Sequence, residues 1–182
     1  MTTRAVPMDL RPYIRSIPDF PKPGIMFRDI TPLLRDARAF KEAIHRMAEP
    51  YAKGAVDVVV GAESRGFIFG AAMALVLDVG FVPVRKKGKL PAKTTRVTYD
   101  LEYGTDTLEM HVDAVSAGTR VLMVDDLLAT GGTMAGSCEM VRTAGAQIVG
   151  VEFLIELSFL KGREKLKAFP VRSQIIFENE LP

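Results

Sequence analysis

The stretch VLMVDDLLATGGTM, residues 121–134, combines the features that decide the fold class of this chain. Its apolar start is typical of a buried strand, and two carboxylates, Asp125 and Asp126, follow that strand directly. A short loop of glycines and hydroxyl side chains comes next, and a helical pattern runs from about Thr133 to Ala144. A strand that leads through such a loop into a helix is typical of anion sites in α/β proteins.

The rest of the chain alternates apolar strands with helical patterns. Helical spacing extends from Asp36 toward a stop at Gly54 and covers 67–77, and strands are expected at 56–61, 81–84, 120–124 and 148–157. This alternation predicts an α/β fold with a mostly parallel twisted sheet flanked by helices.

One segment, residues 94–111 (TTRVTYDLEYGTDTLEMH), breaks the alternation of strands and helices. Its side chains alternate with period two on either side of YGTDT, which predicts an antiparallel hairpin. We expect this hairpin to project from the main sheet, where it can act as a hood over a site.

Composition limits the number of domains and the class of ligand. With 182 residues, 48% of them hydrophobic and 25% charged, the chain suits a single domain spanning 1–182, into which the 94–111 hairpin is inserted. The formal charge of +2 is too small to indicate nucleic-acid binding, so any anion site must be local.

Cysteine, histidine and hydropathy patterns argue against several other classes. Cys138 is the only cysteine, which excludes an intramolecular disulfide and fits a reducing compartment; a packed thiol is expected there. His45 and His111 lie far apart without zinc-ligand spacing. Neither a signal peptide nor a membrane span is evident, so we expect a cytoplasmic protein that does not engage membranes.

The loop ATGGT, residues 129–133, has the chemistry of a monophosphate site. Small residues let backbone amides close around an anion, and the following helix adds its positive dipole end. The loop is neither a Walker A motif nor a Rossmann fingerprint. Asp125 and Asp126 can accept hydrogen bonds from two neighbouring hydroxyls, so ribose 5-phosphate fits the combination. Either fragment alone would be read as an ordinary capped turn.

Two further loops carry cationic groups. GAESRGF, residues 61–67, again joins a strand to a helix, and Arg65 in it can hold an anion bidentately. The loop VRKKGKLP, residues 84–91, carries four basic side chains and would by itself be read as a solvated or RNA-contacting loop. Beside the first loop, it would complete a diphosphate site.

These motifs together resemble the type I phosphoribosyltransferases, and among them the adenine phosphoribosyltransferase subfamily. The resemblance covers roughly residues 14 to 168 in the expected order. No function is assigned to the first ten or the last dozen residues. The segments that carry the resemblance are IPDFPKPGIMFRDITPLL, GAESRGFIFG, VRKKGKLP, YDLEYGTDTLEMH, VLMVDDLLATGGT and IELSFLKGREKL.

The resemblance implies a reaction and a metal. The family moves the 5-phosphoribosyl group of 5-phosphoribosyl 1-diphosphate to a base, here adenine, giving AMP and diphosphate in purine salvage. Magnesium (Mg2+) would come mainly with the substrate diphosphate, without a dedicated protein ligand. The residues implied for the ribose 5-phosphate are Asp125 and Asp126 for the hydroxyls and Ala129, Thr130, Gly131, Gly132 and Thr133 for the phosphate.

The resemblance also assigns the diphosphate end. In this family the first loop often contains a non-proline cis peptide, whose presence the sequence does not reveal. Some basic side chains of the second loop reach a neighbouring subunit in the family, so a homodimer is expected. The implied residues are Glu63, Ser64 and Arg65 in the first loop and Arg85, Lys86 and Lys89 in the second.

The base and hood sites follow from the same comparison. Phe27 would stack on adenine while backbone groups of Met26 and Arg28 read its edge, and Leu160 would cover the other face, although Phe27 and Leu160 are also plausible core residues by type. In the hairpin, Glu102 is the candidate proton acceptor, and Tyr103 lies beside it in the hood.

Two alternatives remain open at this point. The chain could sense 5-phosphoribosyl diphosphate as a regulator without catalysis, although the roughly 35 residues before the first long helix show no helix-turn-helix pattern. It could also use xanthine, hypoxanthine, guanine or orotate, because the phosphate and ribose motifs do not distinguish among bases.

Overall fold

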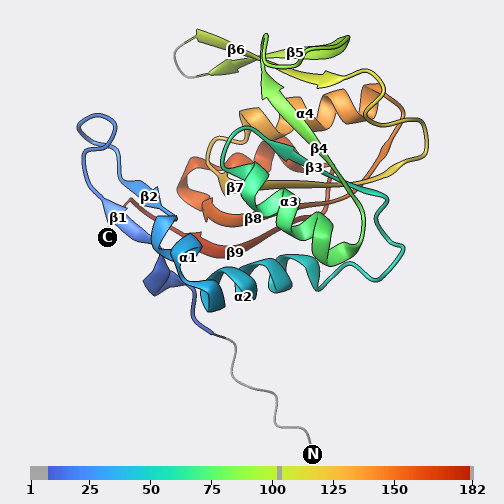
Figure 1. The fold of residues 1–182 in the computed structure, drawn as a ribbon. Helices are drawn as coiled ribbons and strands as arrows, with labels where there is room; N and C mark the ends of the chain where they lie inside the picture. Colours follow the sequence, from blue (N-terminus) through green and yellow to red (C-terminus); the bar gives the residue numbers. More distant parts are fainter. Residues whose placement is uncertain (1–7, 102–103, 181–182) are drawn as a thin grey trace, which may run out of the picture.

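A seven-stranded sheet forms the centre of the computed structural model, which describes residues 8–101 and 104–180 (Figure 1). The strand order is β5-β6-β4-β3-β7-β8-β9. The last five strands in that order pair in parallel, and the first two pair antiparallel, so the predicted mostly parallel sheet is confirmed. The strands are β3 (Val58–Ala62), β4 (Gly80–Lys86), β5 (Thr94–Leu101), β6 (Gly104–His111), β7 (Arg120–Leu128), β8 (Gln147–Leu157) and β9 (Val171–Phe177).

Three long helices cover the sheet and divide its core in two. The helices α2 (Ala37–Ala48) and α3 (Gly66–Leu77) pack with each other and bury one cluster of apolar side chains. Helix α4 (Gly132–Thr143) buries a second cluster together with the hairpin β5–β6 (Figure 1). The sequence patterns predicted all three helices, with α3 and α4 correct to within a residue at each end.

Helix α2 ends earlier than the helical spacing suggested. Asp36 caps its start by accepting hydrogen bonds from the amides of Arg38 and Ala39, both at 2.9 Å. The helix stops at Ala48 instead of near Gly54, because Pro50 has no backbone N–H with which to continue the helical hydrogen bonds after Glu49. Tyr51 is therefore outside the helix.

Several elements lay outside the sequence prediction. A two-stranded antiparallel sheet of β1 (Arg15–Ile17) and β2 (Phe27–Asp29) precedes the short helix α1 (Thr31–Arg35), and β9 adds an edge to the main sheet. The chain between β1 and β2 includes a cis peptide at Phe20–Pro21. The remaining helical turns are the 3-10 helices η1 (Arg11–Tyr13), η2 (Ser158–Leu160) and η3 (Gly162–Leu166).

Strand β7 continues past the point where the sequence suggested that it ends. The two aspartates lie inside the strand near its carboxyl end, because β8 keeps pairing with it as far as Leu128 opposite Glu156. The hairpin differs as well: β6 pairs with β4 through Arg85 opposite Glu109, so the base of the hairpin extends the sheet.

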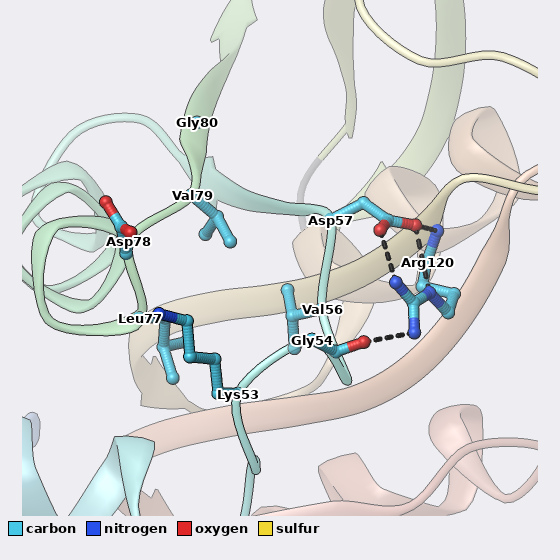
Figure 2. A pocket seen from close by; sticks show the side chains of 9 residues that line it. All are labelled: Lys53, Gly54, Val56, Asp57, Leu77, Asp78, Val79, Gly80 and Arg120. Carbon is cyan, nitrogen blue, oxygen red and sulfur yellow. Dashed lines mark hydrogen bonds and ion pairs between the residues drawn. The ribbon is translucent and has the colours of Figure 1, made fainter.

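The amino ends of β3, β4 and β7 surround a hollow of about 480 Å³ (Figure 2). Arg120 ties this edge together: its Nε donates to Asp57 Oδ2 at 3.0 Å, and its guanidinium also donates to the carbonyl of Gly54. Hydrogen bonds from the Arg120 side chain and backbone lower the pKa of Asp57 to about 2. The hollow therefore lies at the opposite edge of the sheet from the loops that follow β3 and β7.

A buried carboxyl group joins the end of α2 to the sheet edge. Glu152 on β8 is fully buried, and Tyr51 Oη donates to its Oε1 at 2.9 Å. Arg172 and Gln174 on β9 approach the same carboxyl group at 3.3 Å. Burial raises the pKa of Glu152 to about 7, so the carboxyl group is protonated over part of the physiological range.

Replacing Glu152 tests this assignment. A carboxyl group whose pKa is raised on folding contributes stability below its unfolded value of about 4.5, and this contribution is lost as pH rises through about 7. Urea unfolding of the wild type should therefore show a free energy of unfolding that falls more between pH 5 and pH 8 than that of Glu152→Gln. The exposed-site variant Glu178→Gln serves as the control, and identical pH dependence in all three proteins would contradict the assignment.

Candidate active site

Two of the predicted loops meet at the carboxyl edge of the parallel strands. The loop after β3 contains Glu63, Ser64 and Arg65, and the loop after β7 contains residues 129–131. Because β3 and β7 are neighbours in the sheet, their following loops open on the same side. The sequence therefore predicted correctly which segments come together.

The loop after β7 surrounds a small cavity of about 80 Å³. Gly131 adopts φ 77°, which favours glycine, and α4 begins directly after it. The first turn of α4 is fixed by Ser137 Oγ, which donates to the carbonyl of Thr133 at 2.8 Å. The cavity is lined by Asp125, Phe153 and residues 127–134, which include all five predicted phosphate-loop residues, Ala129, Thr130, Gly131, Gly132 and Thr133.

Gly162 supports this loop from outside and was not recognised from the sequence. A Cβ atom at Gly162 would lie 2.2 Å from the carbonyl oxygen of Ala129, and one at Gly131 would lie 2.5 Å from the carbonyl oxygen of Gly162. The two backbones therefore touch. The only local signal is the sequence LKG, in which Lys161 takes a left-handed conformation before the glycine.

The carboxylates of Asp125 and Asp126 are held side by side. Asp125 Oδ1 accepts a hydrogen bond from the Asp126 amide at 2.9 Å. Gly66 permits this placement, because a Cβ atom there would lie 2.6 Å from Asp125 Oδ1. Burial raises the pKa of both carboxyl groups; the charge of Asp126 raises that of Asp125 further, whereas Arg65 opposes the rise for Asp126. Asp126 is therefore the more readily ionised of the two.

Arg65 connects the aspartates to the predicted base site. Its Nη2 lies 2.8 Å from Asp126 Oδ2, and its guanidinium carbon lies 5.2 Å from the centroid of the Phe27 ring. In the structure Arg65 lies between a carboxylate and an aromatic ring, and its binding of a diphosphate stays a prediction.

Glu63 binds basic residues of the segment 84–91, which covers the end of β4 and the loop that follows it. Its carboxylate lies 2.6 Å from Lys89 Nζ and 3.2 Å from Arg85 Nη2, and it accepts a hydrogen bond from the Lys86 amide at 3.1 Å. Although burial alone would raise it, the pKa of Glu63 is lowered to about 2 by these hydrogen bonds. The peptide bond between Glu63 and Ser64 is cis, as is frequent in the family that the chain resembles. The basic loop is thus held against the first loop.

Among the residues predicted to bind the base, Phe27 and Leu160 have accessible side chains, whereas the Arg28 side chain is buried. Phe27 on β2 is half-buried and packs edge-on against Phe20 at 5.0 Å, and Leu160 on η2 is partly exposed two residues before Gly162. The Arg28 side chain is buried elsewhere, where it donates to Ser16 Oγ and stacks 3.9 Å from the Phe177 ring centroid. Only the backbone of Arg28, beside Met26 and Phe27, is therefore available to a base.

Some expectations concern other parts of the chain. Glu102 and Tyr103 lie outside the described residues. Cys138 is buried in α4, and burial raises its pKa to about 12, as suits a packed thiol. Among residues 8–101 and 104–180, no three histidine, cysteine or acidic side chains group as metal ligands, and no helix there is long and apolar enough to cross a membrane.

Comparisons with known proteins point to one family. A family model described as a phosphoribosyl transferase domain matches residues 29–177. An adenine phosphoribosyltransferase of Roseiflexus sp. is 58% identical over 167 residues, covering 92% of this chain and 97% of that protein. The adenine phosphoribosyltransferase structure from Thermoanaerobacter pseudethanolicus is 51% identical, with a TM-score of 0.87 and coverage of 92% and 98%.

A structure from Saccharomyces cerevisiae adds a ligand to the comparison. It is an adenine phosphoribosyltransferase complexed with an imino-altritol bisphosphate and adenine. It is 43% identical to this chain, with a TM-score of 0.84 and coverage of 91% of this chain and 96% of that one.

Adding a methyl group at Gly162 tests the support of the loop after β7. Gly162→Ala must displace the backbone at Ala129, so the affinity for inorganic phosphate, measured by calorimetry, should fall about tenfold or more. Gly80→Ala is the matched control, because its Cβ would lie at an ordinary 3.7 Å from Val58 Cγ2. Unchanged phosphate affinity in a folded Gly162→Ala variant would contradict the expected role.

Proposed function

The chain belongs to the phosphoribosyltransferase family, and we propose that it transfers the 5-phosphoribosyl group of 5-phosphoribosyl 1-diphosphate to adenine, giving AMP and diphosphate in purine salvage. The observation that carries the proposal is the continuous arrangement of the loop after β7, the paired aspartates, Arg65 and Phe27. These groups follow one another in the order phosphate, ribose and base of the product.

The loop after β7 holds the 5-phosphate of the substrate. Backbone amides at Gly131 and Gly132 and the amino end of α4 attract its negative charge, and the hydroxyls of Thr130 and Thr133 can donate to its oxygens. Close backbone contact with Gly162 keeps the loop rigid, so little conformational entropy is lost when the phosphate binds.

The two carboxyl groups bind the ribose and act on the reacting carbon. Both accept hydrogen bonds from the neighbouring ribose hydroxyls. As the bond to diphosphate breaks, positive charge develops on the sugar, and a nearby carboxylate stabilises it. Asp126 suits this role better than Asp125, because Arg65 favours its ionised form.

The leaving diphosphate is met by Arg65, the backbone at Glu63 and Ser64, and the basic loop. Arg85 and Lys89 are gathered by Glu63 at the edge of this region, where Lys86 also lies. Magnesium prefers oxygen ligands such as those of the diphosphate, and when bound with it supplies charge neutralisation for its departure. The side chains of the chain orient the same group and stabilise its charge.

The base enters between Phe27 and Leu160, where the backbone at Met26 and Arg28 reads its edge. Stacking on Phe27 fixes the plane of adenine, and the hood carrying Glu102 and Tyr103 excludes water. Glu102 accepts the proton that the base loses on forming the new bond to carbon. The half-buried Phe27 ring, next to Arg65, supports this placement.

The protein acts as a homodimer, and we place the contact on α3. This helix is apolar on every side, which is typical of a helix buried on every side. Its outer stripe of Ile68, Leu75 and Val76 is exposed, and the Leu75 side chain is 84% exposed. Because α3 begins next to Arg65, a second copy docked there would bring basic side chains toward the site. The free, buried Cys138 supports a cytoplasmic location.

A coupled assay tests the activity. Diphosphate release should require 5-phosphoribosyl diphosphate, magnesium and adenine together, and AMP should accumulate in equal amount.

Asp126→Asn should lower kcat by about a hundredfold or more while the fold, followed by circular dichroism, is retained. Asp113→Asn, at an exposed position after β6, is the control. Turnover with hypoxanthine or orotate but not adenine would refute the assignment, and binding without turnover would favour a sensor.

A charge on α3 tests the dimer. Leu75→Glu places a carboxylate in the proposed apolar contact, so sedimentation should show a dimer for the wild type and a monomer for the variant. Val112→Glu, at a 55% exposed valine away from α3, should remain dimeric. A monomeric wild type, or a dimeric Leu75→Glu variant, would contradict this contact.

A further inference from the structure

The hairpin touches the loop after β7 through a residue that has no role in the site described above. Tyr99 on β5 places its hydroxyl oxygen 3.2 Å from Thr133 Oγ1, the last residue of the proposed 5-phosphate loop. Residues 99 and 133 lie 34 positions apart in the sequence. A side-chain hydrogen bond thus joins the proposed hood to the proposed phosphate site.

The packing beneath this hydrogen bond keeps Tyr99 in place. Val97 and Tyr99 lie on the same face of β5, because side chains alternate along a strand. Both pack with the apolar cluster under α4. Gly136 in α4 leaves room for them: a Cβ atom there would lie 3.1 Å from Val97 Cγ1 and 3.4 Å from Tyr99 Cδ1. The hairpin therefore rests directly on the first turns of α4.

Tyr99 also lies directly opposite Asp106 in the β5–β6 ladder, so the two side chains share one face of the hairpin. Asp106 in turn lies 3.2 Å from Lys86 Nζ, in the basic loop. Burial raises the pKa of Tyr99, and Asp106 raises it further, whereas the hydrogen bond with Thr133 and the charge of Lys86 lower it; the net shift is upward, so the phenol keeps its proton at neutral pH. Because Lys86 neutralises Asp106, the carboxylate competes less strongly for that proton.

The hydroxyl groups of Tyr99 and Thr133 have one proton each, and this limits which of them can donate to a phosphate. A threonine hydroxyl has one proton to donate and can accept a hydrogen bond in return, whereas an ionised phosphate only accepts. When Thr133 donates its proton to a phosphate, its oxygen needs a donor, and the Tyr99 hydroxyl lies at the right distance to be that donor. A charged acceptor strengthens such a chain of hydrogen bonds.

We propose that Tyr99 is a positioning residue for the 5-phosphate: its hydroxyl donates to Thr133 Oγ1 and thereby directs the Thr133 proton to the phosphate. The proposal rests on the proposed function, since it takes the loop after β7 to be the phosphate site. It assigns to strand β5 of the hairpin a task that is separate from the roles proposed for Glu102 and Tyr103.

A double-mutant cycle with ribose 5-phosphate as the probe tests the proposal. Tyr99→Phe removes only the hydroxyl, Thr133→Val removes the hydroxyl that it bonds, and the third protein carries both changes. Tyr99→Phe should weaken ribose 5-phosphate binding, measured by calorimetry, about tenfold, as fits the loss of a hydrogen bond in a chain that ends on a charge. In the Thr133→Val background the same change should alter the affinity less than twofold. Tyr13→Phe, in η1, is the matched control.

Turnover separates positioning from general loosening of the fold. With Tyr99→Phe the KM for 5-phosphoribosyl diphosphate should rise about tenfold, whereas kcat and the KM for adenine should change less than twofold. Equal weakening by Tyr99→Phe in both backgrounds would assign its effect to packing and overturn the proposal, as would unchanged affinity in either single variant. Failure of the proposed function would instead be seen in the wild type, as no turnover of adenine while the binding cycle still holds.

Discussion

Two adjacent carboxyl groups near the end of a central strand repel each other, and the architecture of the site follows from how that repulsion is relieved. The Asp125 carboxyl group accepts a hydrogen bond from the Asp126 amide and lies where a side chain at position 66 would stand, so Gly66 leaves room for it. The Asp126 carboxyl group pairs with Arg65. Because Gly66 and Arg65 both belong to the start of α3, the strand-to-helix connection after β3 must lie against the end of β7. The neighbouring parallel strands make that contact possible.

Local ion pairs keep basic side chains at the proposed anion sites of a chain with a formal charge of only +2. Glu63 gathers Arg85 and Lys89, Asp106 pairs with Lys86, and Asp126 pairs with Arg65, so each cation is kept near the site at little electrostatic cost. A highly charged ligand offers more acceptor oxygens than a single carboxylate, so these cations can turn to it when it binds.

Periodicity predicted the central strands because burial on both faces leaves an unbroken apolar run, as in VLMV, and it predicted the long helices because apolar residues recur at helical spacing. It did not predict β9 or the pair β1 and β2, which are edge or two-stranded elements whose residues VRSQIIF and RSI mix polar and apolar types. The end of α2 at Ala48 was not predicted because the apolar spacing continues past Pro50 to Tyr51, which packs on the core from outside the helix. The contacts of Gly162, the Glu63 carboxylate and Tyr99 were not predicted because each is made with a residue distant in the sequence, which leaves no local pattern.

In the proposed site, a contiguous sequence motif binds the sugar phosphate and backbone groups bind the base. The sequence therefore predicts the sugar phosphate more directly than the base. In that proposed site, the ribose 5-phosphate is held by residues adjacent in the chain, so carboxylates, glycines and hydroxyls form one contiguous motif. The proposed base site instead uses backbone groups near Met26 and Arg28, and the Arg28 side chain faces away toward Phe177. Backbone donors and acceptors are the same for every residue type except proline, so their specificity depends on the path of β2 relative to Phe27. Strand β2 is held by its pairing with β1, and its Phe27 ring lies against Arg65, which also pairs with Asp126, so the proposed base site and the proposed ribose site share one side chain.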